Sequence, residues 1–184
     1  MTGVQTCALP ISEQQWGWPS KFLHWLTAAL ILVQIPLGFY ADDLANSPLK
    51  LELFGWHKSL GILVLMLAIM RLLWRMAGSI PTLPDASFIQ RRLANLGHSL
   101  LYGLMLVLPL SGWLMSSAAN RPINWFWIME LPALTGPNKA LKQIAEEVHE
   151  ISVILLLVVL AVHIGAALWH QFKRRDSILR RMWF

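Results

Sequence analysis

Charged residues are absent from four long stretches of this chain, namely residues 22–41, 59–70, 93–120 and 151–172. A helix of about 20 apolar residues spans the hydrocarbon core of a bilayer and satisfies its own backbone hydrogen bonds, which lipid cannot do. The second stretch is short, but a mostly apolar run extends over residues 51–74. The basic side chains within this run are long enough to reach the membrane interface. The pattern predicts an all-α, integral membrane four-helix bundle. We expect spans over about residues 20–41, 53–75, 93–118 and 147–173.

The segments between the spans are less regular. Residues 121–136 combine aromatic residues with Pro122 and Pro132, which predicts irregular or interfacial structure at the membrane surface. Residues 138–150 are predicted to form a helix that leads into the fourth span. The four spans and three connections leave no room for a second folded unit, so we expect one domain over residues 16–184.

Residues 1–15 differ from the rest of the chain. They have neither the basic start nor the apolar core of a secretory signal, and we expect a disordered leader that is not native to the protein. Cys7, the only cysteine, lies there and is given no function. A single cysteine also excludes an internal disulfide and any cluster of cysteine ligands.

Composition supports a membrane protein, because 56% of the residues are hydrophobic and only 14% are charged. The basic residues gather at one side: before span one, between spans two and three, and after span four. The positive-inside rule then predicts that both termini face the cytoplasm. Basic residues that flank spans fit anionic lipid headgroups, so we expect no nucleic-acid partner. The opposite side holds seven acidic and five basic residues.

Six histidines lie in or beside the predicted spans: His24, His57, His98, His149, His163 and His170. An ionisable side chain within a membrane is a functional candidate, although any single histidine could simply bind a neighbouring helix. The spacing of 14 residues between His149 and His163 places them about 40° apart around a helix and roughly 21 Å along it. One of these two histidines therefore lies toward each leaflet.

Two other spans carry a histidine at a matching depth. We predict the pairs His57 with His149 and His24 with His163, where His170 is an alternative to His163. Two ligands are too few for zinc, whereas haem iron already has four ring nitrogens and needs only two axial ones. Small residues follow three of these histidines by one turn (Ala28, Gly61, Ala167) and leave room for a flat macrocycle or for close helix packing.

These residues resemble the bacterial cytochrome b561 family, four-helix dihaem membrane proteins related to the b-type subunits of membrane hydrogenases. The resemblance covers residues 16–184 and rests on the order of several short motifs. They are FLHW (22–25), WHKSLG (56–61), MRLLWR (70–75), LGH (96–98) and EVHE (147–150), followed by His163 to His170.

The resemblance implies two b-type haems with axial iron ligands at His24, His57, His149 and His163. Such haems would carry electrons across the membrane between a quinone pool, such as ubiquinone, and a redox partner on the periplasmic side. His98, His170 and Arg71 are candidates for a quinone site. One branch of the family is similar to superoxide oxidases, which pass electrons from superoxide to ubiquinone.

Two alternatives remain open at this stage. A superoxide oxidase would benefit from a positive outer face that steers the anion, and the acidic excess there does not favour one. Six histidines could instead line an ion or proton path in a transporter, but the spans contain no Asp or Glu, which such relays commonly use.

Overall fold

The computed structural model describes residues 16–78, 87–175 and 179–183, so the predicted leader and Cys7 lie outside the described residues. Four helices in this part of the chain are long and apolar enough to cross a membrane. They are α1 (Trp18–Asp43), α2 (Pro48–Ala77), α3 (Phe88–Ala118) and α4 (Lys139–Trp169). A π-helical turn, η2 (His170–Arg174), continues α4, and a short 3-10 helix, η3 (Leu179–Arg181), follows. The predicted four-helix membrane bundle is confirmed.

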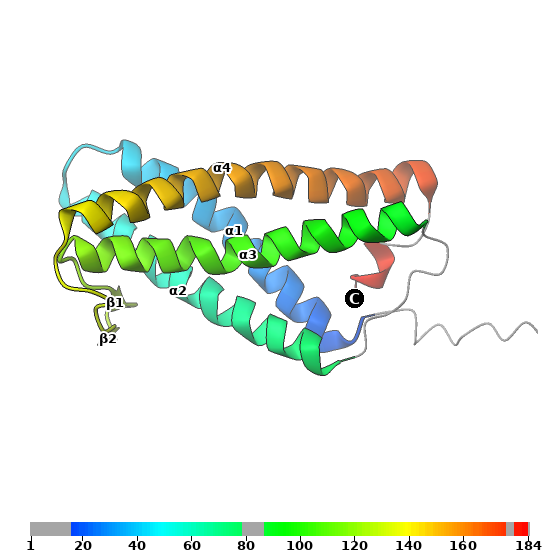
Figure 1. Ribbon diagram of the computed structural model, residues 1–184, viewed down its shortest axis with the longest axis horizontal. Coiled ribbons are helices and arrows are strands. Elements are labelled where there is room, and N and C mark those ends of the chain that lie inside the picture. Colours follow the sequence, from blue (N-terminus) through cyan, green and yellow to red (C-terminus); the bar gives the residue numbers. More distant parts are fainter. Residues whose placement is uncertain (1–15, 79–86, 176–178, 184) are drawn as a thin grey trace, which may run out of the picture.

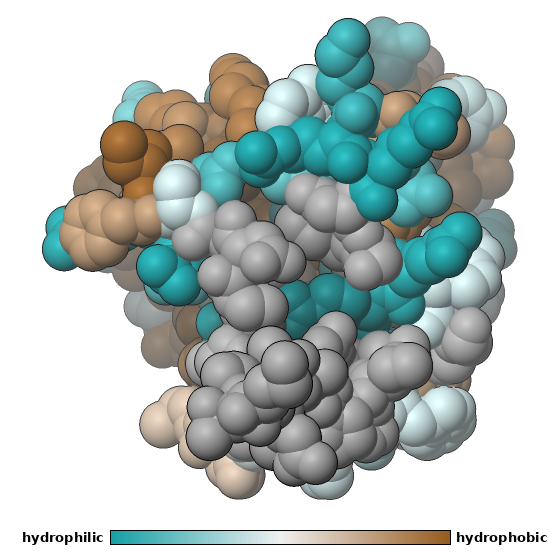
Figure 2. Space-filling view, turned by 90° about the vertical axis from the view of Figure 1, so that its right-hand side faces the viewer, coloured by the Kyte–Doolittle hydropathy of each residue, from teal (hydrophilic) through white to brown (hydrophobic). Residues whose placement is uncertain are grey.

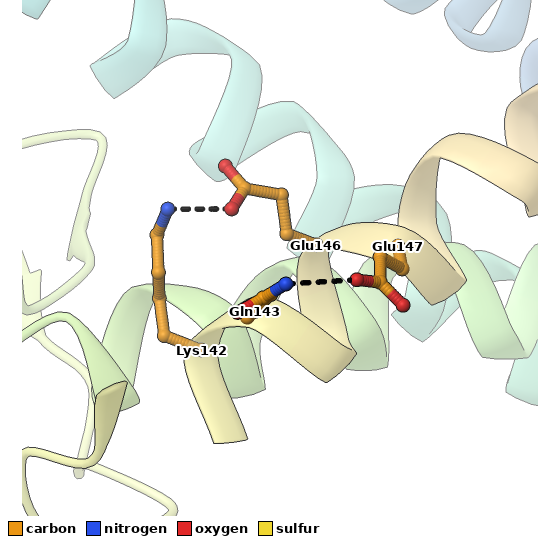
Figure 3. A network of polar contacts seen from close by, with 4 residues as sticks. All are labelled: Lys142, Gln143, Glu146 and Glu147. Atoms are coloured by element: carbon orange, nitrogen blue, oxygen red, sulfur yellow. Dashed lines mark hydrogen bonds and ion pairs between the residues drawn. The ribbon is translucent and has the colours of Figure 1, made fainter. Parts of the chain in front are cut away.

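Three of the four long helices begin where a side chain satisfies a free backbone N–H group. Ser47 accepts a hydrogen bond from the backbone of Lys50, and Ser87 forms a capping box with Gln90. Asn138 caps α4 in the same way, so the helix starts eight residues before the predicted span and includes the expected lead. The first turns of α4 are further supported by the pairs Lys142–Glu146 and Gln143–Glu147 at i,i+4 spacing (Figure 3).

The helices pack in chain order: α1 contacts α2, α2 contacts α3, and α3 contacts α4. In Figure 1, α4 runs alongside α3 while α1 and α2 cross this pair obliquely. Among the described residues, α4 makes few close backbone contacts with α1 or α2. This arrangement leaves space between α4 and the first two helices, and that space holds the site described below.

Most buried side chains belong to α2 and α3, whereas large apolar side chains are exposed on all four helices. Exposed apolar surface of this extent is expected where lipid replaces water around a bundle. The share of buried residues is lowest on α1 and α4, which suits helices that contact the rest of the bundle along one face only.

The start of α1 and the end of α4 lie at the same end of the molecule (Figure 1). We call it the basic end, because arginines and lysines occur in the last turns of α2, in the first turns of α3 and after α4. Figure 2 views this end and shows hydrophilic surface across it. The chain after α4 returns to α1, where Trp25 donates a hydrogen bond to the carbonyl of Met182 at 2.8 Å.

A small antiparallel hairpin lies at the opposite end, which we call the hairpin end (Figure 1). Its strands are β1 (Asn124–Trp125) and β2 (Met129–Glu130). The hairpin is bound to α2 through Ser59, whose hydroxyl accepts a hydrogen bond from the backbone of Phe126 at 2.9 Å. The ring of Trp127 lies against Gly55, one turn earlier on α2. A segment predicted to be irregular or interfacial thus covers the end of α2 that carries His57.

Candidate cofactor-binding site

At the hairpin end, α2 and α4 bring His57 and His149 together. Their ring centroids are 6.4 Å apart, and the ring planes are inclined by 72°. His57 lies ten residues into α2, and His149 lies at the end of the charged first turns of α4, between Glu147 and Glu150. The two helices do not pack closely against each other, so the imidazoles approach across the space between them.

At the basic end, α1 and α4 bring His24 and His163 together with nearly the same geometry. Their ring centroids are 6.3 Å apart and the planes are inclined by 66°. The ring centroid of His98 on α3 lies 5.6 Å from that of His163. His170 instead packs at 5.1 Å on Trp169, its neighbour in the chain. The structure therefore places His24 opposite His163, with His98 as a close third residue.

The spacing of both pairs fits one metal ion between two imidazoles. A bond from an imidazole nitrogen to a metal is about 2 Å long, and the nitrogen lies roughly 1.2 Å from its ring centroid, which gives about 6.4 Å between centroids. The observed separations of 6.4 and 6.3 Å agree with this value. Within the described residues, no group of three or more His, Cys, Asp or Glu side chains could hold a metal ion by itself. Iron in a macrocycle is the metal that needs only two protein ligands.

Hydrogen bonds orient one of these imidazoles. The Nδ1 of His149 lies 3.0 Å from the carbonyl oxygen of Leu108 and 3.1 Å from the hydroxyl of Ser111. Because a carbonyl can only accept, His149 donates its Nδ1–H there, and Nε2 carries the lone pair that a metal requires. The Nδ1 atoms of His24 and His57 are buried and lack a hydrogen-bond partner within the described residues.

Two glycines allow helices to approach the rings at the hairpin end. A Cβ atom on Gly38 of α1 would lie 2.8 Å from Cε1 of His57, closer than real Cβ contacts allow. A Cβ on Gly112 of α3 would lie 3.4 Å from the ring of His149, which is ordinary contact. Gln34 of α1 donates a hydrogen bond to the carbonyl of His57 at 2.9 Å. Gln34, Gly38 and Gly112 all line a cavity of about 1510 Å³. His57 and His149 line the same cavity.

Sequence reasoning did not identify several of these residues. It pointed to Gly61 as space beside a histidine, but a Cβ there would face the amide of Gln34 at 3.3 Å. Gly38 and Gly112 each follow a helical proline by two or three residues, and this is the only sequence signal near them. Ser111 and the carbonyl of Leu108 carry no signal, because their role depends on the rotation of α3 relative to α4.

The charges at the mouth of the large cavity are balanced. Its lining includes four acidic and four basic side chains, namely Asp42, Glu52, Glu146, Glu150, Lys50, Lys58, Arg121 and Lys142. Lys142 and Glu146 are paired with each other (Figure 3). The mouth therefore offers no uniformly positive or negative field.

Two arginines lie beside the histidines at the basic end. The guanidinium of Arg71 lies 5.4 Å from the centre of the Tyr102 ring, and that of Arg75 lies 5.8 Å from it. Arg71 is close enough to interact electrostatically with His24, His98 and His163. Arg71 and His98, both candidates for a quinone site, are thus brought together, while His170 remains at the end of α4.

Comparisons with known proteins agree with this geometry. The family described as prokaryotic cytochrome b561 matches residues 15–184. Cytochrome b561 homolog 2 of Escherichia coli strain K12 is 32% identical over 179 residues, which cover 93% of this chain and 92% of the relative. Cytochrome b561 homolog 1 of the same strain is 29% identical and covers 88% of this chain and 92% of the relative.

A third relative, named Probable superoxide oxidase CybB, comes from Yersinia pestis. It is 27% identical over 165 residues, which cover 87% of this chain and 90% of the relative. The family implies binding of b-type haem and electron transfer in a bacterial membrane. The chain belongs to the prokaryotic cytochrome b561 family.

Proposed function

We propose that this protein carries single electrons across the bacterial inner membrane through two b-type haems, one toward each leaflet. His57 and His149 would hold the haem at the hairpin end, and His24 and His163 would hold the haem at the basic end. Residues 16–184 would form one domain with both termini in the cytoplasm, so the basic end would face inward.

The observation that carries this proposal is the repeated spacing of the two histidine pairs. Two independent pairs, about 21 Å apart along α4 by helical rise, have ring separations that differ by only 0.1 Å and both suit one metal ion. A histidine that merely stabilises helix packing needs no partner at this distance. A transporter lined with histidines would not need the rings in opposed pairs either.

The residues at the hairpin end suit a haem. A haem held by two imidazoles would have no open iron site, so it would supply one-electron transfer and not oxygen activation. His149 is held in the required tautomer by Leu108 and Ser111. Gly38 and Gly112 admit the helix backbones close to the rings, and apolar side chains surround the site. The low polarity around the irons would help to exclude water.

We also propose a quinone, such as ubiquinone, as the partner at the basic end. His98 is the best-placed residue, because its ring lies 5.6 Å from His163 and could bind a quinone oxygen beside the haem. His170 and Arg71 are the further candidates. The redox partner at the hairpin end is not identified by its chemistry.

Superoxide oxidation is a subordinate candidate, supported by the relative that bears this name. The balanced charges at the mouth of the cavity do not favour capture of an anion. A superoxide-dependent reduction of ubiquinone by the purified protein would establish this activity, and its absence would leave the general electron carrier.

Spectroscopy of the purified protein tests the proposal. Oxidised and dithionite-reduced spectra should show sharp low-spin b-type bands, with about two haems per chain. His57→Ala or His149→Ala should remove one haem, and His24→Ala or His163→Ala should remove the other. His98→Ala should retain both haems but slow electron transfer to quinone. A folded protein without these bands, or loss of a haem in His98→Ala with retention in His24→Ala, would contradict the assignment.

A further inference from the structure

Arg71 and Arg75 form an unusual pair of positive charges at the basic end. They lie one helical turn apart on α2, where like charges repel each other. Both side chains are partly buried, and both guanidiniums lie against the ring of Tyr102 from α3. Arg75 also lies 6.0 Å from the ring of Trp16. Aromatic rings from two other segments thus hold the two cations in place.

No carboxylate neutralises this pair within the part of the chain that the structure describes. The only ion pair found there joins Lys142 and Glu146, at the opposite end of the bundle. The described acidic residues all lie toward the hairpin end: at the end of α1, in the first turns of α2 and of α4, and in β2. Partly buried guanidiniums without an anionic partner are costly, and planar guanidiniums match carboxylate or phosphate oxygens through paired hydrogen bonds.

We propose that Arg71 and Arg75 form a clamp for an anionic group, with Tyr102 between them, beside the His24–His163 pair. This inference rests on the proposed function. The favoured anion is the pair of carboxylates on the haem at the basic end, because Arg71 is within electrostatic range of both proposed iron ligands. The phosphate of a lipid in the same leaflet offers similar chemistry. The clamp assigns Arg71 to an anion and leaves the quinone to His98.

Haem loss from the purified holoprotein provides the first test. Arg71→Gln and Arg75→Gln should release one of the two haems to apomyoglobin about tenfold to hundredfold faster, because charge-assisted hydrogen bonds are lost. Arg71→Lys should give an intermediate rate, since it keeps the charge but not the paired geometry. Arg92→Gln is a matched control, because Arg92 also lies on a ring, that of Phe88 at 4.6 Å, but is exposed.

Two further readouts identify the anion. If the clamp holds haem carboxylates, loss of positive charge should shift one of the two reduction potentials to a more negative value. If it holds a lipid phosphate, the Gln variants should contain less bound phospholipid after purification and lose haem at the rate of the original protein. Unchanged haem release, potentials and bound phosphate in both Gln variants would overturn the clamp.

The outcomes separate this inference from the proposed function. Two haems in the original protein with no change in the variants would refute only the clamp. A protein without haem would refute the proposed function and the carboxylate assignment together. If Arg71→Gln does not accumulate, two other variants still decide the question. Arg75→Gln keeps the guanidinium of Arg71, and Arg71→Lys keeps the positive charge at that position.

Discussion

His149 differs from the other proposed ligands in the hydrogen bonds that orient its ring. Its Nδ1 lies within hydrogen-bond distance of both Leu108 and Ser111, and the Ser111 hydroxyl lies 2.9 Å from the carbonyl of Leu108. Acceptors at Nδ1–H increase the electron density at Nε2, which favours oxidised iron over reduced iron. The ligands at the hairpin end therefore include one imidazole whose basicity depends on α3.

Ser111→Ala tests this dependence. The variant should retain both haems, because the carbonyl of Leu108 still accepts the proton of His149. The reduction potential of one haem should rise by up to about 40 mV, equivalent to about 1 kcal/mol for one lost hydrogen bond. A redox titration followed at the reduced b-type bands measures the shift, and Ser111→Thr should restore the original value. No shift would mean that the hydroxyl does not influence the ligand.

Gly38 is a second residue whose role can be tested directly. In Gly38→Ala, the new Cβ would lie 2.8 Å from the His57 ring, so the ring must move away from His149. We expect this variant to bind about one haem per chain when it is purified. Gly103→Ala is the control, because no atom lies within 4 Å of its added Cβ and alanine is a better helix former. Equal haem content in both variants would show that His57 has room to adjust.

The histidines themselves could be predicted from sequence, because polar rings in apolar spans are rare and their spacing follows from helical geometry. The residues around them could not. Gly61 seemed suitable by its distance along the chain, yet Gly38 on another helix makes the close approach to His57. Which side chain meets a ring depends on how two helices are rotated against each other, and single-helix periodicity does not contain that information.

At the level of elements, the hairpin is the least regular part of the described chain. Phe126 and Trp127 have φ values of 49° and 56°, in the left-handed region that aromatic residues rarely adopt. Such backbone strain persists only where surrounding contacts enforce it. Ser59 provides these contacts: its hydroxyl accepts from Phe126, and its carbonyl accepts from the indole of Trp125 at 3.1 Å.

Ser59→Ala should loosen the hairpin. Ser59 is fully buried, so the variant leaves the N–H of Phe126 without its acceptor and should lower the free energy of unfolding by about 1–3 kcal/mol. Hydrogen exchange in residues 124–130 should become faster, while exchange in the four helices should not change. Ser99→Ala serves as the control because Ser99 is exposed on α3. Protection of the hairpin equal to that in the original protein would argue against Ser59 as its anchor.

The helices were predictable for a simple reason. In lipid, each span must be helical and long enough to cross the apolar layer, so hydropathy alone identifies it. Three helices, α2, α3 and α4, begin five to eight residues before the predicted spans, because the capping side chains of Ser47, Ser87 and Asn138 act outside the apolar region. The hairpin was not predicted, since its strands are only two residues long and depend on a contact with a distant serine.

For the whole molecule, the two histidine pairs join parts of the bundle that otherwise make few close contacts. Both pairs connect α4 to α1 or α2, and these helices pack mainly against their neighbours in the chain. The haems would thus complete the packing between α4 and the first two helices. The charge distribution predicts the orientation of the bundle, with the basic end in the cytoplasm.

Labelling of introduced cysteines tests this orientation. In a Cys7→Ser background, which removes the only cysteine of the chain, Gly136→Cys should react with a membrane-impermeant maleimide in intact spheroplasts. Arg91→Cys, an exposed position at the basic end, should react only after the membrane is permeabilised. The two sites lie on opposite sides if the positive-inside rule holds. The reverse labelling pattern would place the basic end outside.

The sequence by itself determined the four spans, their order and the histidines at two depths, because bilayer thickness and helical rise are set by physics that acts on each segment separately. Only the tertiary structure decided that His163 and not His170 opposes His24, that His98 lies beside His163, and that Arg71 and Arg75 share one tyrosine ring. These features depend on the rotation and crossing of helices, which arise from packing between side chains far apart in the chain.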